Sequence, residues 1–145
     1  MGIKRDKYDA IISDLVRHRA NWTSARCGTI SKEGQVTGKD RAMHCSHFTG
    51  RGAGNIARYD TDAISCHCAT CHHYLENRPD EHSAWFASKY GEAHREIIRQ
   101  KHNQVKKMHK SDKEAMRKHY ETELDRVIRQ RKEGAAGFIE TVSFF

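Results

Sequence analysis

The chain has 145 residues, a length that favours a single domain. It carries 26 Lys or Arg against 19 Asp or Glu, and the net charge of +7 favours a polyanionic partner, of which nucleic acid is the commonest. No apolar run reaches membrane-spanning length and the first residues do not resemble a signal peptide, so we expect a cytoplasmic protein with no membrane partner.

The chain opens with a helical pattern. Apolar residues recur at helical spacing from Tyr8 to Val16, with charged residues on the opposite face. This pattern predicts a helix over residues 6–21 whose apolar stripe packs into the core. Trp22, directly after it, is expected to pack beside Cys27.

Residues 29–48 contain glycines and show no helical period. They predict short strands with a turn near residues 33–34, the second strand ending in residues 44–48. Successive side chains of a strand point to opposite faces. We therefore expect Cys45 and His47 on one face, and His44 and Ser46 on the other.

Residues 49–62 are expected to form a loop, because glycines at positions 50, 52 and 54 interrupt any regular element. The loop carries Arg51 and Arg58. Their forked guanidinium groups suit bidentate contacts with phosphate. The sequence therefore predicts a phosphate-binding loop.

The remainder of the chain is expected to be mainly helical. Capping residues, glycines and apolar spacing mark the ends of each helix. Ile97 and Ile98 are expected to face inward. The predicted helices cover residues 68–75, 80–89, 92–102 and 111–132, the last beginning with a capping box at residues 111–114.

A linker at residues 134–137 precedes an apolar tail. Residues 138–145 alternate like a strand, which predicts pairing with the chain's own sheet or with another subunit. The apolar stripe of residues 115–128 is typical of a core or a dimer seam.

Positive charge is concentrated toward the C-terminus. Residues 89–133 carry 14 basic and 8 acidic side chains. They predict a basic arm that binds DNA without sequence preference, and its candidate contacts are Lys101, Lys106, Lys107 and Lys110. We expect a core over residues 1–91, this arm over residues 92–133, and a linker with tail over residues 134–145.

Cysteine and histidine gather in one stretch. Nine of the residues at positions 44–73 are Cys or His, and they include a Cys68-x-x-Cys71 pair. A Cys27-Gly28 pair lies farther upstream. Thiolates and imidazoles are preferred ligands of zinc, so two segments could bind one ion. Five cysteines without a secretory signal also favour a metal site over disulfides.

These motifs together resemble the phage NinG/Rap recombination nucleases, a family of the HNH or His-Me finger endonuclease superfamily. The resemblance covers roughly residues 10–130. It is carried by Cys27-Gly28-Thr29, Cys45-Ser46-His47-Phe48, Arg51, Arg58-Tyr59-Asp60, Cys68-x-x-Cys71-His72 and Lys89-Tyr90-Gly91.

The resemblance implies an α+β fold: a zinc-braced ββα-metal core with an N-terminal helix and a C-terminal helical arm. It implies metal-dependent hydrolysis of phosphodiesters in branched DNA such as Holliday junctions. A phage-encoded member would act in the cytoplasm of a bacterial host.

The resemblance also implies roles for individual residues. His47 matches the histidine that acts as general base, a role that suits an imidazole titrating near neutral pH. His72 matches a ligand of the catalytic Mg²⁺ or Mn²⁺, which stabilises charge on the phosphate. Arg51 and Arg58 match basic positions that orient the DNA backbone, and Arg58 is counted with the catalytic residues.

Three positions depart from the family pattern. Ser24 stands where the first zinc-binding cysteine is expected, with Cys66 as the best replacement and Cys45 as the second choice. Ser46 stands where many members have a metal-binding Asp, for which His44 or Asp62 could substitute. Ala63 stands where an Asn orients the catalytic histidine.

Two hypotheses for function follow. The first is a structure-selective DNA endonuclease with a structural zinc ion. The second is a non-catalytic, zinc-braced DNA-binding module derived from the same fold. A homodimer is expected in the first case, since a four-way junction is close to two-fold symmetric. The tail at residues 138–145 is the preferred dimer seam, and a tail folded back on its own chain is the alternative.

Overall fold

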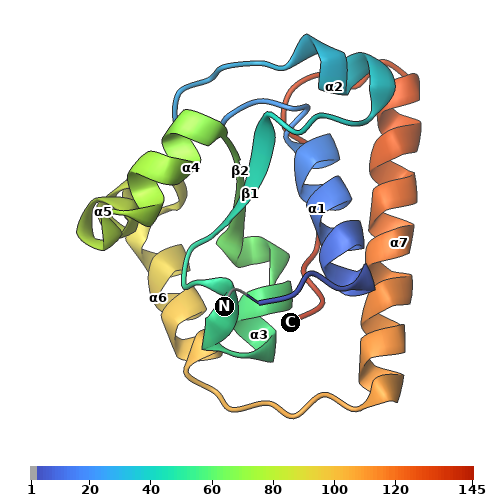
Figure 1. Cartoon of the computed structure of the whole chain (residues 1–145). Coiled ribbons are helices and arrows are strands. Elements are labelled where there is room, and N and C mark those ends of the chain that lie inside the picture. Colours follow the sequence, from blue (N-terminus) through green and yellow to red (C-terminus); the bar gives the residue numbers. More distant parts are fainter. Residues whose placement is uncertain (1–2) are drawn as a thin grey trace.

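The computed structural model describes residues 3–145. The expectation that the first residues are not a signal peptide includes residues 1 and 2, which lie outside the described residues. Over the described residues the fold is α+β, with a two-stranded sheet between two groups of helices (Figure 1). The elements are α1 (Lys7–Arg19), α2 (Lys32–Thr37), β1 (Met43–His47), a 3-10 turn (Arg51–Ala53), α3 (Asn55–Tyr59), a second 3-10 turn (Thr61–Ala63), β2 (Ile64–Cys68), α4 (Ala69–Glu76), α5 (Pro79–Tyr90), α6 (Glu92–His102) and α7 (Lys110–Lys132).

The sheet pairs β1 and β2 in antiparallel fashion, with Met43 opposite Cys68 and His47 opposite Ile64. Side chains alternate between its two faces. Met43, Ile64 and Cys66 join the apolar core on the side of α1. His44, opposite His67, belongs to the other face.

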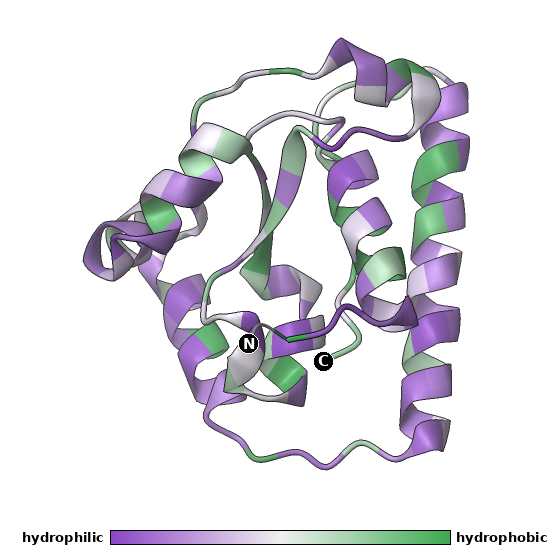
Figure 2. Ribbon diagram, in the orientation of Figure 1, coloured by the Kyte–Doolittle hydropathy of each residue, from purple (hydrophilic) through white to green (hydrophobic). Residues whose placement is uncertain are grey.

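Helices α1 and α7 run side by side on one flank of the sheet (Figure 1). Asp6 caps α1 by accepting hydrogen bonds from the backbone N–H groups of Tyr8 and Asp9. Along their contact, Val16 of α1 and Met116 and Val127 of α7 have no exposed surface. Figure 2 shows apolar residues at intervals along α7. The predicted stripe of residues 115–128 is therefore part of the chain's own core.

A second apolar cluster lies on the other flank, where α5 and α6 pack together. It contains Ala63, Phe86 and Ile98, all of them buried. Ile97 is 59% exposed, so only one of the two isoleucines predicted to face inward does so. Adjacent helical residues are about 100° apart around the axis, which explains the difference.

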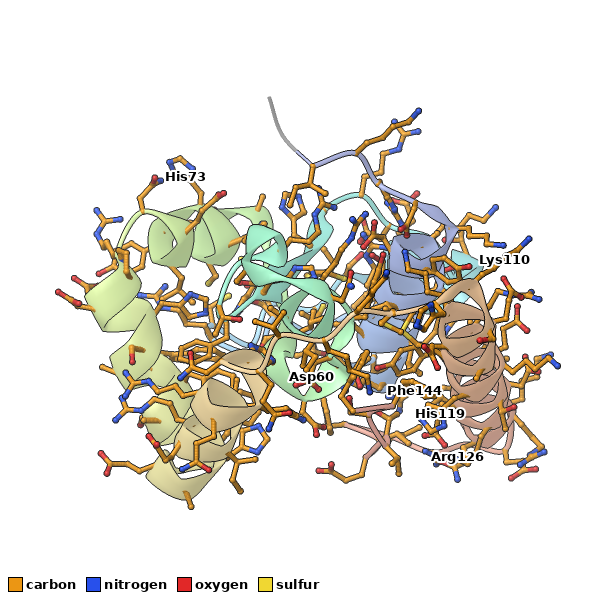
Figure 3. The ribbon with its side chains drawn as sticks, turned by 90° about the horizontal axis from the view of Figure 1, so that it is seen from below. Asp60, His73, Lys110, His119, Arg126 and Phe144 are labelled. Atoms are coloured by element: carbon orange, nitrogen blue, oxygen red, sulfur yellow. The ribbon has the colours of Figure 1, made fainter. Side chains whose placement is uncertain are left out.

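The C-terminal tail packs on its own chain and forms no strand within residues 138–145. The backbone N–H of Ile139 donates to the carbonyl oxygen of Arg19 at 2.9 Å. Farther along, the backbone N–H of Phe144 donates to the hydroxyl of Tyr120 at 3.2 Å, and Phe144 lies beside His119 of α7 (Figure 3). The predicted tail strand is wrong, and the tail instead folds back on its own chain, the alternative to its use as a dimer seam.

Three local predictions are also wrong. Residues 33–34 lie in α2, because the Ser31 hydroxyl caps this helix by accepting from the N–H of Gly34. The expected loop of residues 49–62 contains α3. Helix α7 begins one residue earlier than the expected capping box, with the N–H of His109 donating to Asp112 Oδ2 at 2.9 Å.

The three segments predicted for the chain share one apolar core. Tyr59 of the first segment, Tyr120 of the second and Ile139 of the third belong to the same buried cluster. Among residues 3–145, no helix is both long enough and apolar enough to cross a membrane.

Candidate functional site

Three cysteines from two parts of the chain meet at the end of β2. The Sγ atoms of Cys27, Cys68 and Cys71 all lie within 4.8 Å of one another. Those of Cys27 and Cys68 are 3.7 Å apart, close to the separation of about 3.8 Å expected for two thiolates on one tetrahedral zinc ion. This group, the thiol cluster, can hold a metal ion and is compatible with structural zinc.

A tight turn between α1 and α2 positions Cys27. The backbone N–H of Gly28 donates to the carbonyl oxygen of Ser24 at 2.8 Å. Gly28 has φ +77°, a left-handed conformation that favours glycine. The N–H of Ala25 donates to the carbonyl oxygen of Cys66 at 2.8 Å, so the turn is fixed to β2.

Ser24 lies inside this turn and is 1% exposed. Its hydroxyl accepts a hydrogen bond from the backbone N–H of Cys68 at 3.0 Å. Hydrogen bonds with the hydroxyls of Ser24 and Thr29 lower the pKa of the Cys27 thiol to about 6. The residue that replaces the expected cysteine therefore still lies against the thiol cluster.

Cys66 and Cys45 lie outside the thiol cluster, so the prediction that one of them is the fourth ligand is wrong. Cys66 is 2% exposed within the core beside α1, and burial raises the pKa of its thiol to about 12. The thiol of Cys45 contacts the carbonyl oxygen of Ser13. Two residues of strand span about 6.6 Å, which separates Cys66 from the end of β2 where Cys68 reaches the cluster.

A cavity of about 810 Å³ is lined by residues of α1, β1, α4 and α5 and of the segments between them. We call it the histidine pocket. Its polar lining is dominated by imidazole and guanidinium groups, a combination that can hold a divalent ion and a phosphate. These groups belong to His44, His47, His72, His82, Arg5, Arg17, Arg41 and Arg51.

His44 of β1 and His72 of α4 converge in this pocket. Their Nδ1 atoms are 2.9 Å apart, and their rings meet edge to face. Burial lowers the pKa of His72, which favours the neutral imidazole that binds metals. The structure thus brings together two of the three residues predicted to bind the catalytic ion.

Asp62, the third predicted ligand, lies elsewhere. Its Oδ2 is 3.5 Å from Lys101 Nζ, and its backbone oxygen accepts a hydrogen bond from His94 of α6 at 3.0 Å. Asp62 does not line the histidine pocket. The 3-10 turn that carries Asp62 faces α6 rather than α4, so this prediction is wrong.

His47, the predicted base, is held by a backbone carbonyl. Its Nε2 donates to the oxygen of Arg58 at 3.2 Å, which leaves Nδ1 with a lone pair. This bond orients the ring although Ala63 stands where an orienting Asn was expected. Burial lowers the pKa of His47, so the ring is neutral at pH 7.

Arg58 is committed to the N-terminal segment. Its Nε donates to Asp9 Oδ1 at 3.1 Å and its Nη2 to Asp9 Oδ2 at 2.5 Å. Nη2 also donates to the carbonyl oxygen of Lys4 at 2.9 Å, and Asp9 raises the pKa of the guanidinium group. Arg58 therefore ties α3 to α1, and its guanidinium group is already paired with a carboxylate.

The four candidate lysines have different surroundings. Lys101 is largely buried, with its Nζ 3.0 Å from Asp60 Oδ2, so its ammonium group is already paired within the chain. Lys106, Lys107 and Lys110 are exposed, and Figure 3 shows Lys110 at the outer edge of the molecule. Arg51 donates to the carbonyl oxygen of Ile3 at 2.5 Å and lines the histidine pocket.

The sequence did not predict a buried network around Asp60, which is fully enclosed (Figure 3). His102 Nε2 lies 2.9 Å from Asp60 Oδ2, and the Ser143 hydroxyl donates to Oδ1 at 2.6 Å. Although burial opposes it, hydrogen bonds with His102, Ser143 and Lys101 lower the pKa of Asp60. These residues are far apart in sequence, so no local motif could have revealed them.

The arginines Arg5, Arg17 and Arg41 in the pocket were also missed, because only the fold gathers them. No protein-family model, curated protein or solved structure matches the chain. Its function is therefore inferred from its own residues.

Proposed function

We propose that the chain is a metal-dependent DNA endonuclease of the HNH type that cleaves branched recombination intermediates. The observation that carries the proposal is the convergence of His44, His47 and His72 on one arginine-lined pocket. The order β1, β2, α4, with the thiol cluster at the end of β2, is the arrangement expected of a zinc-braced ββα-metal unit.

His47 supplies the base in this proposal. Its Nε2 is occupied by the carbonyl oxygen of Arg58, so Nδ1 accepts a proton from the attacking water. Burial lowers the pKa of His47, which keeps the ring unprotonated and able to act at neutral pH.

The arginines bind the DNA backbone. Arg5, Arg41 and Arg51 reach the pocket from three separate segments, and guanidinium groups bind phosphate oxygens in pairs. Arg17 donates from Nε to the carbonyl oxygen of Met43 at 2.9 Å, which fixes it against β1. His44 and His72 would hold a divalent ion, which would supply Lewis-acid stabilisation of charge on the scissile phosphate.

The test is cleavage of four-way junction, flap and duplex DNA by the full chain with added divalent ions. His47→Ala is expected to slow cleavage about 100-fold or more, because a general base contributes to rate rather than to affinity. DNA affinity and zinc content are expected to stay unchanged. The matched control is His73→Ala, whose side chain lies on the outer side of α4 (Figure 3).

If the His47→Ala variant cleaves DNA as fast as the unchanged chain, His47 is not the general base. Faster cleavage of duplex DNA than of junction DNA would contradict the proposal that the substrate is branched. That part of the proposal is supported by the sequence resemblance.

A second candidate function is DNA binding without catalysis. It is favoured by Ser46, which replaces the usual metal-binding carboxylate and is 3% exposed, and by the engagement of Arg58 with Asp9. Tight binding of junction DNA without cleavage under any divalent ion would establish this alternative.

A further inference from the structure

The thiol cluster offers a metal ion three ligands and no fourth. Among residues 3–145, no further Cys, His, Asp or Glu ligand atom lies within 4.8 Å of the Sγ atoms of Cys27, Cys68 and Cys71 together. Closed structural zinc sites have four protein ligands, whereas sites with three protein ligands keep one position for a ligand from solution. An ion held here would therefore have one coordination position that the chain does not fill.

Solvent reaches this side of the molecule, because Cys27 is exposed and Cys68 is half-buried. The two nearby hydroxyls already have partners. That of Ser24 accepts from the backbone N–H of Cys68 at 3.0 Å, and that of Thr29 lies 3.1 Å from Cys27 Sγ. Zinc also prefers a soft thiolate to a neutral hydroxyl. A thiol from solution is therefore the ligand that best suits the fourth position.

A hollow of about 530 Å³ adjoins the cluster at α4. Its lining residues are Ala69, Thr70, His73, Tyr74 and Arg78. The first two of these are the residues between Cys68 and Cys71, so the hollow begins at the metal-binding turn. Its volume lies within the range of about 300–1,000 Å³ that holds small-molecule ligands.

Two guanidinium groups lie at this hollow. The Cζ atoms of Arg26 and Arg78 are 4.2 Å and 4.1 Å from the centroid of the Tyr74 ring. Within residues 3–145, neither group forms an ion pair with a carboxylate; the Glu81 carboxylate instead accepts from the Tyr74 hydroxyl. Guanidinium groups bind carboxylates through paired hydrogen bonds, so these two favour an acidic ligand.

Arg26 also reduces the negative charge of the cluster. Its Nη1 lies 3.6 Å from Cys71 Sγ. Thiols that coordinate a metal ion are deprotonated, so a divalent ion with three thiolates is already anionic and a fourth thiolate adds to that charge. On binding, the incoming thiol loses its proton to solvent and its sulfur forms the fourth bond to the ion. A cation beside the cluster makes this step more favourable.

We propose that the thiol cluster and the adjoining hollow bind a small acidic thiol. Its sulfur occupies the fourth position on the ion, and its carboxylates pair with Arg26 and Arg78. The inference goes beyond a structural role for zinc and does not depend on the proposed nuclease activity. Reduced glutathione, a tripeptide thiol with two carboxylates, is the probe.

The experiment is an anaerobic titration of reduced glutathione into the full chain with one equivalent of Co²⁺ in place of Zn²⁺ at the thiol cluster. Each cobalt–thiolate bond contributes to the near-ultraviolet absorption. We expect this absorption to rise by about one-third, because four thiolates replace three, and to saturate at one glutathione per chain.

Two other compounds separate the parts of the ligand. S-methylglutathione has the same carboxylates but no thiol, and it should leave the absorption unchanged. The neutral thiol 2-mercaptoethanol should produce the same rise, but only at a concentration about tenfold higher, since it forms neither ion pair.

Variants test the residues of the site. Arg26→Gln and Arg78→Gln should each raise the half-saturating concentration of glutathione by about two- to fivefold, with little effect on that of 2-mercaptoethanol. Arg99→Gln, which removes the same charge from an exposed position on α6, is the matched control. Ser24→Cys should have the higher absorption before any thiol is added and should not respond to glutathione, because a fourth protein thiolate fills the position.

An absorption that stays unchanged at millimolar glutathione, or loss of Co²⁺ from the chain during the titration, would overturn the ligand site. Equal half-saturating concentrations of glutathione and 2-mercaptoethanol would overturn the acidic class of the ligand. Unchanged glutathione affinity in both arginine variants would overturn the role of Arg26 and Arg78.

Discussion

The thiol cluster and the histidine pocket share helix α4, where Cys71 and His72 are consecutive residues. The thiol cluster takes its three ligands from two short turns, one before α2 and one at the start of α4. The pocket instead draws on α1, β1, the following loop and α4. Local spacing in the sequence therefore determines two of the three ligands of the first site, Cys68 and Cys71, whereas the packing of distant elements determines the second site.

The difference predicts that the two sites fail in different ways. A metal ion in the thiol cluster joins the turn at Cys27 to β2 and α4, so its loss should lower stability. The pocket residues lie on elements that the core already holds together, so their loss should affect ligands and rate more than stability. Variants of each site test this distinction.

The largest expected effect is on stability. Cys68→Ser with Cys71→Ser should abolish the binding of about one zinc ion per chain. With free zinc about a thousandfold above its Kd, this removes about 4 kcal/mol of stability, equivalent to roughly 10 °C in Tm for a chain of this size. Metal analysis and thermal unfolding measure both quantities.

Two controls accompany that variant. The unchanged chain in a chelator should unfold near the temperature of the double variant. The double variant His44→Ala with His72→Ala, measured with zinc as the only added metal ion, should have a Tm within about 3 °C of that of the unchanged chain. An equal fall in Tm in both double variants would contradict the proposed distinction between the two sites.

The second effect concerns DNA affinity. Replacing Lys106, Lys107 and Lys110 by alanine should lower the salt dependence of binding by about 0.9 for each phosphate that is no longer neutralised. Lys101→Ala is the matched control, because its Nζ pairs with the enclosed Asp60. It should leave the salt dependence unchanged and reduce stability by about 1–3 kcal/mol, because the enclosed Asp60 loses one partner while it keeps His102 and Ser143.

Binding of a fluorescent four-way junction at several salt concentrations measures the salt dependence. If the triple variant keeps the full salt dependence, the DNA lies against another part of the surface. A reduced salt dependence in Lys101→Ala would contradict the assignment of this lysine to the core.

Much of the helical structure was predictable because its signals are local. The prediction of residues 92–102 matches α6, which follows Gly91 and has Ile98 facing the core. The helix after Cys68 was found in the same way, from a motif that places one cysteine at the start of a helix. Local spacing also identified Cys68 and Cys71, two of the three residues of the thiol cluster.

The failures involve information that is not local. Arg58 and its partner Asp9 are separated by 49 residues, so the sequence could not show that its guanidinium was occupied. Cys66 differs from Cys68 only in its distance from the end of β2. The tail alternates like a strand, but its pattern serves contacts with Arg19, Tyr120 and Asp60 instead.

The third expected effect tests the position of the missing ligand. Ser24→Cys should place a fourth thiol against the thiol cluster, because the Ser24 hydroxyl already lies beside it. We expect zinc affinity to rise about tenfold or more, since four protein ligands close a structural site. Competition with a chromophoric chelator measures the change.

Ser24→Ala serves as the matched control. It removes the hydroxyl without adding a ligand, and it should not tighten zinc binding. If Ser24→Cys binds zinc no more tightly than the unchanged chain does, the side chain at position 24 does not reach the fourth coordination position of the zinc ion.

The smallest effect is on the pH dependence of cleavage, and it depends on the proposed role of His47. Burial lowers the pKa of this imidazole, while the carbonyl oxygen of Arg58 and the carboxylate of Asp9 raise it, and Arg51 and His72 lower it further. A base works when it is unprotonated, so a lowered pKa extends activity toward acid. A cation bound at His44 and His72 acts in the same direction.

We therefore expect the acidic limb of kcat/KM to lie below pH 6.5, the ordinary pKa of histidine. Arg51→Gln removes one of the groups that lower the pKa of His47, so its acidic limb should move to higher pH even if its maximal rate falls. The pH profiles of the two proteins on the same junction DNA measure the shift. An acidic limb above 6.5, or one that moves to lower pH in Arg51→Gln, would assign the titration to a group other than His47.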